Sequence, residues 1–240
     1  MHILSETLFN KFRDVPPIVQ PFESSSSEIL TELDSFKEYF DRRENTALLV
    51  EDQLPTAVFY LLQGRVKLSM NSSAGRRLIL GIAYPGDTLG LAASLFGSKY
   101  DITAETLTPC KFASINRVAF LAFLSRNPSA YRNVVRELCI DRTRAHEQLR
   151  TLGVASGAPA KLARFLLEWC ADGQKTERGT RLSCSFTHDE IAEFIGTSRE
   201  TVSRIFKEFR YHDLLESRGA TLIVSNRKAL EVYAGIEALD

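Results

Sequence analysis

Short apolar runs separated by turn residues fill the chain between about Thr46 and Ile115. Residues 65–70 alternate apolar and polar side chains with a period of two, which is typical of a half-buried strand. Apolar runs over 58–62, 78–83, 102–106 and 110–115 predict further strands, with turns at Gly64 and at residues 85–87. Many short strands at this spacing favour a β-barrel or jelly roll.

Before these strands, apolar residues recur at the spacing of an α-helix. Residues 1–28 contain two adjacent prolines and four consecutive serines, so we expect an N-terminal extension there. Ser27 is in place to cap the helix that follows. The apolar positions that predict this helix are Ile29, Leu30, Leu33, Phe36 and Phe40.

A long helix is predicted over residues 127–153, with Asn127 as its cap and Pro128 in its first turn. Its seam positions step alternately by four and three residues, as in a coiled coil. Either this seam pairs with a second copy of the chain, or the helix packs on its own domain. A charged seam residue, Arg142, costs stability but can fix the register. The predicted dimer interface comprises Tyr131, Val135, Leu138, Arg142, Ala145, Leu149 and Leu152.

Small residues over 154–159 indicate a hinge, and a helix from Ala160 to Ala171 is predicted after it, with Trp169 in the core. The segment 186–209 then contains two helix starts separated by a tight turn. Thr187 and Glu190 have the spacing of a capping box, Gly196 supplies the turn, and Ser198 caps the second helix. The apolar stripe of that helix is formed by Val202, Ile205, Phe206 and Phe209.

This order is typical of a helix-turn-helix whose second helix lies in the major groove of DNA. An ordinary amphipathic helix pair is the alternative, which the caps and the polar order of the outer face disfavour. Arginine can hydrogen-bond guanine, and glutamate can accept a hydrogen bond from the cytosine amino group. A carboxylate near DNA phosphates is unfavourable unless it makes such a base contact. We therefore expect base contacts from Arg199, Glu200, Ser203 and Arg204.

Phosphate contacts are expected from helix starts, hydroxyls and basic side chains around this pair. Apolar runs over 214–217 and 221–224 flank residues 218–220 and predict a small hairpin, the wing of a winged helix. The expected phosphate-contacting residues are Thr187, Ser198, Thr201, Lys207 and, at the tip of the wing, Arg218.

Residues 30–225 resemble the cyclic-AMP receptor protein/FNR (CRP/FNR) family of bacterial transcription regulators, most closely over 196–204 and also over 58–68. The resemblance implies an α+β fold. Its parts are an N-terminal double-stranded β-helix (jelly-roll) sensor domain over 29–126, a dimerisation helix over 127–153, a hinge over 154–159 and a C-terminal winged helix-turn-helix over 160–240.

In the family, residues at the positions of Arg199, Glu200 and Arg204 read bases, and Ser203 resembles the FNR branch. The resemblance thus implies a homodimer on double-stranded DNA, bound at an inverted repeat of TTGA- or TGTGA-like half-sites about one helical turn apart. It also implies RNA polymerase as a partner.

The sensor segment departs from the family's effector patterns. The cyclic-AMP branch has a Gly-Glu pair and an Arg-Ser pair around the phosphate, where this chain has Gly90-Leu91 and Tyr100-Asp101. No cysteine precedes Cys110 to hold an N-terminal iron–sulfur cluster, and no histidine lies in the barrel segment to bind haem. We therefore predict no cofactor, exclude cyclic AMP in the usual mode, and leave the effector unknown.

The four cysteines and four histidines are scattered, so we expect neither a metal site nor a disulfide framework. Cys139 has Arg136 and Arg142 at helical spacing, which makes it a candidate redox thiol. The alternative is that all four thiols are reduced and partly buried, as free cysteines usually are.

A net charge of zero is unusual for a nucleic-acid-binding protein. The charge is unevenly distributed, however: residues 1–110 hold 10 basic and 14 acidic side chains, and residues 111–240 hold 20 and 16. Neutrality therefore does not exclude DNA binding. No apolar run reaches the roughly 20 residues that span a bilayer, and no signal peptide is recognisable, so we expect a cytoplasmic protein without membrane contacts.

Two other function classes compete with a DNA-binding regulator. A jelly roll that senses a small molecule and acts through protein contacts would suit a chain without a basic helix face, but residues 198–212 hold four basic and two acidic side chains. Catalysis is not expected, because the barrel segment has no histidine and the chain has no Gly-rich phosphate loop or nucleophile–base motif.

Overall fold

The computed structural model of the protein describes residues 27–73, 75–153, 157–170, 173–183, 186–218 and 221–236. The chain divides into two compact units, whose described residues run from Ser27 to Ala145 and from His146 to Ile236. We describe each unit by itself.

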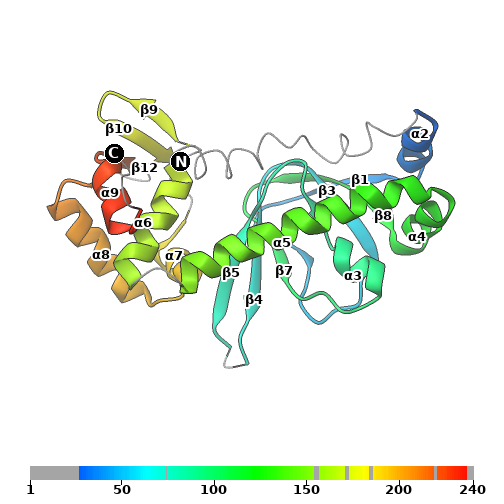
Figure 1. Ribbon diagram of the computed structural model, residues 1–240, viewed down its shortest axis with the longest axis horizontal. Helices are drawn as coiled ribbons and strands as arrows, with labels where there is room; N and C mark the ends of the chain where they lie inside the picture. Colours follow the sequence, from blue (N-terminus) through cyan, green and yellow to red (C-terminus); the bar gives the residue numbers. More distant parts are fainter. Residues whose placement is uncertain are drawn as a thin grey trace. The chain divides into compact units, whose positions relative to one another are not determined.

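Two four-stranded antiparallel sheets form the first unit (Figure 1), with the orders β1-β8-β3-β6 and β2-β7-β4-β5. Strands distant in sequence are neighbours in both sheets, which is the arrangement of a jelly roll. The strands are β1 (Glu38–Arg42), β2 (Ala47–Leu49), β3 (Ala57–Gln63), β4 (Val66–Asn71), β5 (Arg77–Ala83), β6 (Thr88–Leu89), β7 (Thr103–Thr106) and β8 (Cys110–Asn116).

The central strands β3 and β8 of the first sheet bury side chains on both faces, since successive side chains of a strand point to opposite sides. In β3, Phe59 and Leu61 pack inside the roll, while Val58 and Tyr60 pack against helices on the outside. Gly64 makes the tight turn after β3 with a φ of 98°, where a Cβ would lie 2.6 Å from the carbonyl oxygen of Pro109. The predicted turn is confirmed at a position that only glycine fits.

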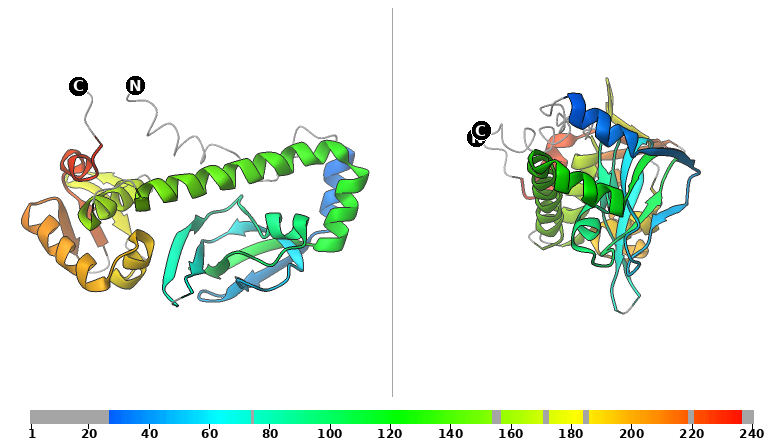
Figure 2. Two further views of the ribbon diagram at one scale, coloured as in Figure 1. Left: turned by 60° about the horizontal axis from the view of Figure 1, so that its bottom comes forward. Right: turned by 90° about the vertical axis from the view of Figure 1, so that its right-hand side faces the viewer.

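The helices of the first unit are α2 (Ser27–Ser35), α3 (Leu91–Phe96), α4 (Arg117–Arg126), the 3₁₀ turn η1 (Pro128–Ala130) and α5 (Tyr131–Gly153), whose last residues belong to the second unit. Figure 2 shows α2 and α4 side by side at one end of the roll. Leu33 of α2 packs there with Phe120 and Phe123 of α4. The Glu32 carboxylate accepts hydrogen bonds from Arg126 at 2.7 Å and from Asn127 at 2.8 Å.

Two local predictions in this unit are wrong. Phe40 is not part of the first helix but lies in β1, where it pairs with Phe112 of β8 and stacks on its ring at a centroid distance of 5.5 Å. Asn127 does not cap a helix with its side chain, which instead donates to Glu32 and to the carbonyl of Phe123. In both cases a partner distant in sequence, β8 or Glu32, overrides the local pattern.

The second unit packs helices against a small antiparallel sheet of order β11-β12-β10-β9. Its elements are α6 (Ala158–Trp169), β9 (Gln174–Thr176), β10 (Gly179–Ser183), α7 (His188–Ile195), α8 (Arg199–Tyr211), β11 (Leu215–Arg218), β12 (Thr221–Val224) and α9 (Arg227–Tyr233). The predicted wing is confirmed as β11 and β12, whereas β9, β10 and α9 were not predicted.

Helix α6 begins at Ala158, inside the segment predicted as a hinge, with Gly157 at its N-cap and Pro159 in its first turn. Residues 154–156 of that predicted hinge, and the predicted helix end at Ala171, lie outside the described residues. Trp169 is half-buried and its ring lies 4.8 Å from that of Phe186, which confirms its place in the core.

Candidate nucleic-acid interface

The two helix starts that define the site are formed as the sequence predicts. The Thr187 hydroxyl accepts a hydrogen bond from the backbone N–H of Glu190 at 3.2 Å, and the Glu190 carboxylate accepts one from the N–H of Thr187 at 3.0 Å. Gly196 ends α7 in the left-handed conformation, with a φ of 64°. Ser198 caps α8 by accepting from the N–H of Thr201 at 3.2 Å. These caps fix where each helix begins and therefore which residues share a face.

Helix α8 buries the predicted stripe in the core of the second unit. Val202 and Phe209 have no exposed surface, and Ile205 and Phe206 are also buried. They pack in a unit whose buried residues include Ile191 and Ile195 of α7. Because α8 has 3.6 residues per turn, burying this stripe turns the intervening polar residues toward solvent.

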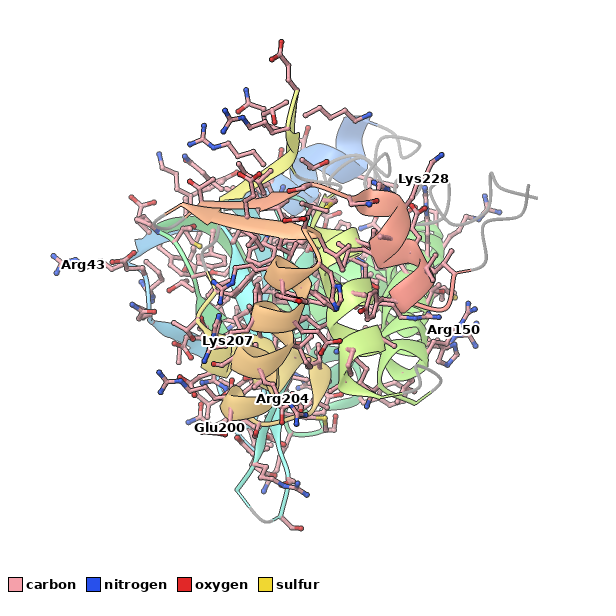
Figure 3. The ribbon with its side chains drawn as sticks, turned by 90° about the vertical axis from the view of Figure 1, so that its left-hand side faces the viewer. Arg43, Arg150, Glu200, Arg204, Lys207 and Lys228 are labelled. Atoms are coloured by element: carbon pink, nitrogen blue, oxygen red, sulfur yellow. The ribbon has the colours of Figure 1, made fainter. Side chains whose placement is uncertain are left out.

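The exposed face of α8 gathers the predicted base-reading residues. An open hollow on this face is lined by Arg199, Glu200, Ser203, Arg204 and Lys207. Figure 3 shows Glu200, Arg204 and Lys207 along the outward side of the helix. All four predicted base-reading residues and one predicted phosphate contact therefore lie on one continuous surface.

Glu200 is held as an ionised acceptor at the start of α8. Hydrogen bonds from its own backbone N–H and from the Ser198 side chain lower the pKa of its carboxyl group, and the charge of Arg199 acts in the same direction. Arg199 itself lies beside Asp189 of α7, with Nε 3.7 Å from Oδ2. Both side chains are exposed, so this ion pair is weak and leaves the guanidinium able to exchange partners.

The remaining predicted phosphate contacts lie at the edges of this face. Thr187 and Ser198 are exposed, and their hydroxyls serve as helix caps. Thr201 is half-buried, with its hydroxyl 3.2 Å from that of Ser198. Arg218 is the last residue of β11, and its side chain lies outside the described residues.

One residue of the site was missed from the sequence. His188, the first residue of α7, places Nδ1 2.8 Å from the Ser203 hydroxyl, and its ring stacks on Phe206 at a centroid distance of 4.8 Å. The imidazole is half-buried beneath the exposed face. No spacing rule connects residues 188 and 203, because the contact depends on how α7 crosses α8.

The sequence left two alternatives for the α5 seam: packing on its own domain or pairing with a second copy of the chain. The structure shows features of both. Val134 is buried and Leu138 is half-buried against the helix-covered face of the first sheet, so α5 packs on its own domain. Tyr131 and Val135 remain 45% and 56% exposed, and Leu149 is 64% exposed. The seam residues Arg142 and Ala145 are exposed as well, whereas Leu152 is half-buried. The described residues thus leave an apolar strip along the helix exposed.

The end of α5 is joined to the helix-turn-helix within the second unit. The Gln148 side-chain amide donates to the carbonyl of Phe194 in α7 at 3.1 Å. A Cβ on Gly196 would lie 3.4 Å from Leu152, so Leu152 packs against the turn between α7 and α8. Leu152, one of two half-buried seam residues, therefore packs on the helix-turn-helix of its own unit.

The thiols differ in accessibility. Cys139 is exposed on α5, which meets one requirement of the redox hypothesis. Cys110 is buried behind Gly64 and donates to the carbonyls of Thr108 and Arg65, and burial raises the pKa of its thiol. Cys184 lies outside the described residues.

The described segments contain neither a metal-binding cluster nor a membrane-spanning helix. Within them, no group of three or more histidine, cysteine, aspartate or glutamate side chains is arranged to hold a metal ion. The helices of the same segments include none that combines the length and the apolar character needed to cross a membrane.

A jelly-roll domain, a long helix with an exposed seam and a winged helix-turn-helix with a polar reading face define a DNA-binding transcription regulator. Comparison with known proteins gives the family. Residues 41–127 match the cyclic nucleotide-binding domain and residues 160–233 the Crp-like helix-turn-helix domain. The chain belongs to the CRP/FNR family, whose members regulate transcription and are not enzymes.

Curated relatives support this assignment. The transcriptional activatory protein AadR of Rhodopseudomonas palustris is 34% identical over 177 residues, which cover 70% of each chain. The nitrogen fixation regulation protein FixK of Bradyrhizobium diazoefficiens is 31% identical over 195 residues, covering 79% of this chain and 76% of that protein.

A solved structure shows the same fold. FixK2 from Bradyrhizobium japonicum superposes with a TM-score of 0.69 at 21% identity, covering 85% of this chain and 98% of that one. The predicted α+β architecture and the family resemblance are therefore confirmed.

Proposed function

We propose that the protein is a homodimer that recognises a palindromic DNA site with TTGA- or TGTGA-like half-sites through the exposed face of α8. One observation carries the proposal: Arg199, Glu200, Ser203, Arg204 and Lys207 line a single surface hollow, while the opposite stripe of the helix is buried. A helix of this kind enters the major groove with its first turns against the base edges.

The chemistry of this face suits direct reading of bases. Arg204 presents a guanidinium that can bond O6 and N7 of one guanine together. Glu200 lies one turn before it, at i−4, and an ionised carboxylate there accepts from a cytosine amino group. Two adjacent readers of opposite charge specify neighbouring base pairs, and each also penalises the wrong base by leaving a charge without a partner.

Phosphate attraction comes from basic residues around the reading face. Residues 198–212 carry two more basic than acidic side chains, and Lys207 lines the same hollow. Each phosphate that a lysine or arginine neutralises releases counterions, so binding weakens steeply with salt. Because the whole chain is neutral, we expect modest non-specific affinity for DNA.

We propose that a second copy of the chain covers the exposed strip of α5. Its exposed apolar members follow the heptad pattern of a parallel two-helix coiled coil, and the charged Arg142 in the seam favours a defined register. A two-fold axis along this seam would present two copies of α8 to two half-sites about one helical turn apart. RNA polymerase is the further partner that the family implies.

We further propose that cyclic AMP is not bound in the family's usual mode. Tyr100, at the predicted phosphate position, is buried, and its hydroxyl lies 3.4 Å from the carbonyl of Ala57. Gly90 leaves no space beside this ring, since a Cβ there would lie 2.9 Å from it.

The surroundings of this position are acidic. Burial raises the pKa of Asp141 in α5 to about 6; the charges of Asp87 and Asp101 add to the rise, and Arg144 opposes it. Burial, and then the charge of Asp141, raises the pKa of Glu137 to about 7. The negative charges of these carboxylates would also repel the phosphate of cyclic AMP.

Arg204→Ala tests the reading face. The operator is first selected from genomic fragments with the purified protein. The variant should bind it about 1–3 kcal/mol more weakly and lose preference at one base pair of each half-site. The matched variant Lys207→Ala should weaken all sequences alike and reduce the salt slope by about one. Unchanged affinity and preference in Arg204→Ala, measured by fluorescence anisotropy, would show that the assigned readout is wrong.

Val135→Asp tests the dimer seam. Two carboxylates would face each other across the two-fold axis without cationic partners, which would destabilise the dimer by several kcal/mol. We expect sedimentation velocity to show a shift from dimer to monomer. Arg136→Asp, which adds a carboxylate on the same helix outside the seam, is the control and should stay dimeric. A Val135→Asp variant that remains as dimeric as its parent contradicts the proposed interface.

Calorimetric titration tests the exclusion of cyclic AMP. We expect no saturable heat when cyclic AMP is added to the protein up to about millimolar concentration, which corresponds to binding weaker than about −4 kcal/mol. Saturable binding at micromolar concentration would contradict the reading of Tyr100 and the acidic groups around Asp101.

A further inference from the structure

The contact between His188 and Ser203 joins the reading face to a titratable group beneath it. Ser203 lines the exposed hollow of α8, and its hydroxyl oxygen is 2.8 Å from Nδ1 of His188. That distance fits a hydrogen bond with either atom as the donor. A serine hydroxyl has one proton, so the direction of this bond decides what Ser203 offers to DNA.

The two possible directions of this hydrogen bond leave Ser203 with different groups free to contact DNA. When Nδ1 carries no proton, the Ser203 O–H donates to it, and the free lone pairs of the oxygen face the groove as an acceptor for an adenine or cytosine amino group. When Nδ1 is protonated, it donates to Ser203, and the hydroxyl proton is free to donate to guanine, thymine or a phosphate.

We propose that His188 is a positioning residue for DNA reading: with its ring proton on Nε2, it accepts from the Ser203 hydroxyl at Nδ1 and holds the Ser203 oxygen as an acceptor toward the base edges. This inference rests on the proposed function of α8. His188 itself does not line the hollow, so it acts through Ser203 and not by its own contact with a base.

The packing of the ring keeps Nδ1 directed at Ser203. It stacks on Phe206 with an interplanar angle of 15°, and Phe206 is buried in the core of the unit. His188 follows Thr187, the N-cap of α7, so its backbone is fixed by the capping box. Stacking and capping together restrain the orientation of the ring.

The charged groups around the ring favour its neutral form. Burial lowers the pKa of His188 below its usual value; the positive charges of Arg210 and Arg199 on α8 lower it further, and Asp189 on α7 opposes them. A lowered pKa favours the uncharged ring at neutral pH, and in its Nε2-protonated tautomer Nδ1 accepts from Ser203. As the pH falls through the lowered pKa, the imidazolium forms, Nδ1 becomes a donor, and the hydroxyl of Ser203 reverses.

The experiment measures the preference of the protein between operators that differ at one base pair, and not its total affinity for DNA. An imidazolium near DNA adds a positive charge, so acidification strengthens phosphate attraction while it disturbs base reading. The measured quantity is the affinity ratio between the selected operator and operators changed at one base pair of the half-site. It is determined at several pH values between about 5 and 8, on both sides of the usual histidine pKa.

The variants His188→Phe, Ser203→Ala and their combination form a double-mutant cycle. Phenylalanine keeps the stacking on Phe206 but removes the ring nitrogens. We expect each single variant to lose about three- to tenfold of the preference at one base pair, the same pair in both, and the double variant to lose no more. The parent's preference at that pair should decline toward acid pH, whereas His188→Phe should show no such decline.

His212→Phe is the matched control, because His212 is an exposed histidine at the other end of α8. It should leave the preference and its pH profile unchanged. If the parent prefers its operator but His188→Phe keeps that preference and its pH profile, or if the cycle is additive, the role of His188 is refuted. If the parent itself shows no sequence preference, the proposed function of α8 fails instead.

Discussion

The buried stripe of α8 is the constraint on which the account of this protein depends. Val202, Ile205, Phe206 and Phe209 are fixed in the core of the second unit, so the helix cannot rotate about its axis. Removing one such side chain from water contributes about 1.5–3 kcal/mol, and four of them hold the helix far more firmly than any exposed ion pair could. The residues between them therefore face outward in a fixed order, which is what reading a base sequence requires.

A second constraint acts on α5. This helix uses Val134 and part of Leu138 to pack on its own jelly roll, while Tyr131 and Val135 stay exposed beside them. At its other end, Leu152 packs on the turn between α7 and α8. One helix thus contributes to the sensor core, carries the proposed dimer seam and contacts the DNA-reading unit.

The charge distribution follows the same division. The acidic excess lies in the first half of the chain, and carboxylates such as Glu137 and Asp141 crowd the face of α5 that meets the roll. The basic excess lies in the second half, where the reading face is. A neutral total therefore combines an acidic first half with a basic second half.

Local signals predicted the parts of the structure that local chemistry determines. The capping box at Thr187, the turn at Gly196 and the period of α8 depend on residues within a few positions of one another, and all are confirmed. Phe40 was misassigned because its partner, Phe112, is supplied by a strand 70 residues later. Asn127 was misassigned because Glu32 competes for its side chain. The contact of His188 with Ser203 was not predictable for the same reason, since it arises from the crossing of two helices and not from any spacing in the chain.

In the proposed complex, two copies of α8, related by the two-fold axis of an α5 seam, read two half-sites of one operator. Hydroxyl-radical footprinting of the protein on its selected operator examines this arrangement. We expect two protected segments, symmetric about the centre of the site, whose half-sites are about 10–10.5 base pairs apart on one face of the duplex. A single protected half-site at saturating protein, or protection without two-fold symmetry, would contradict this arrangement.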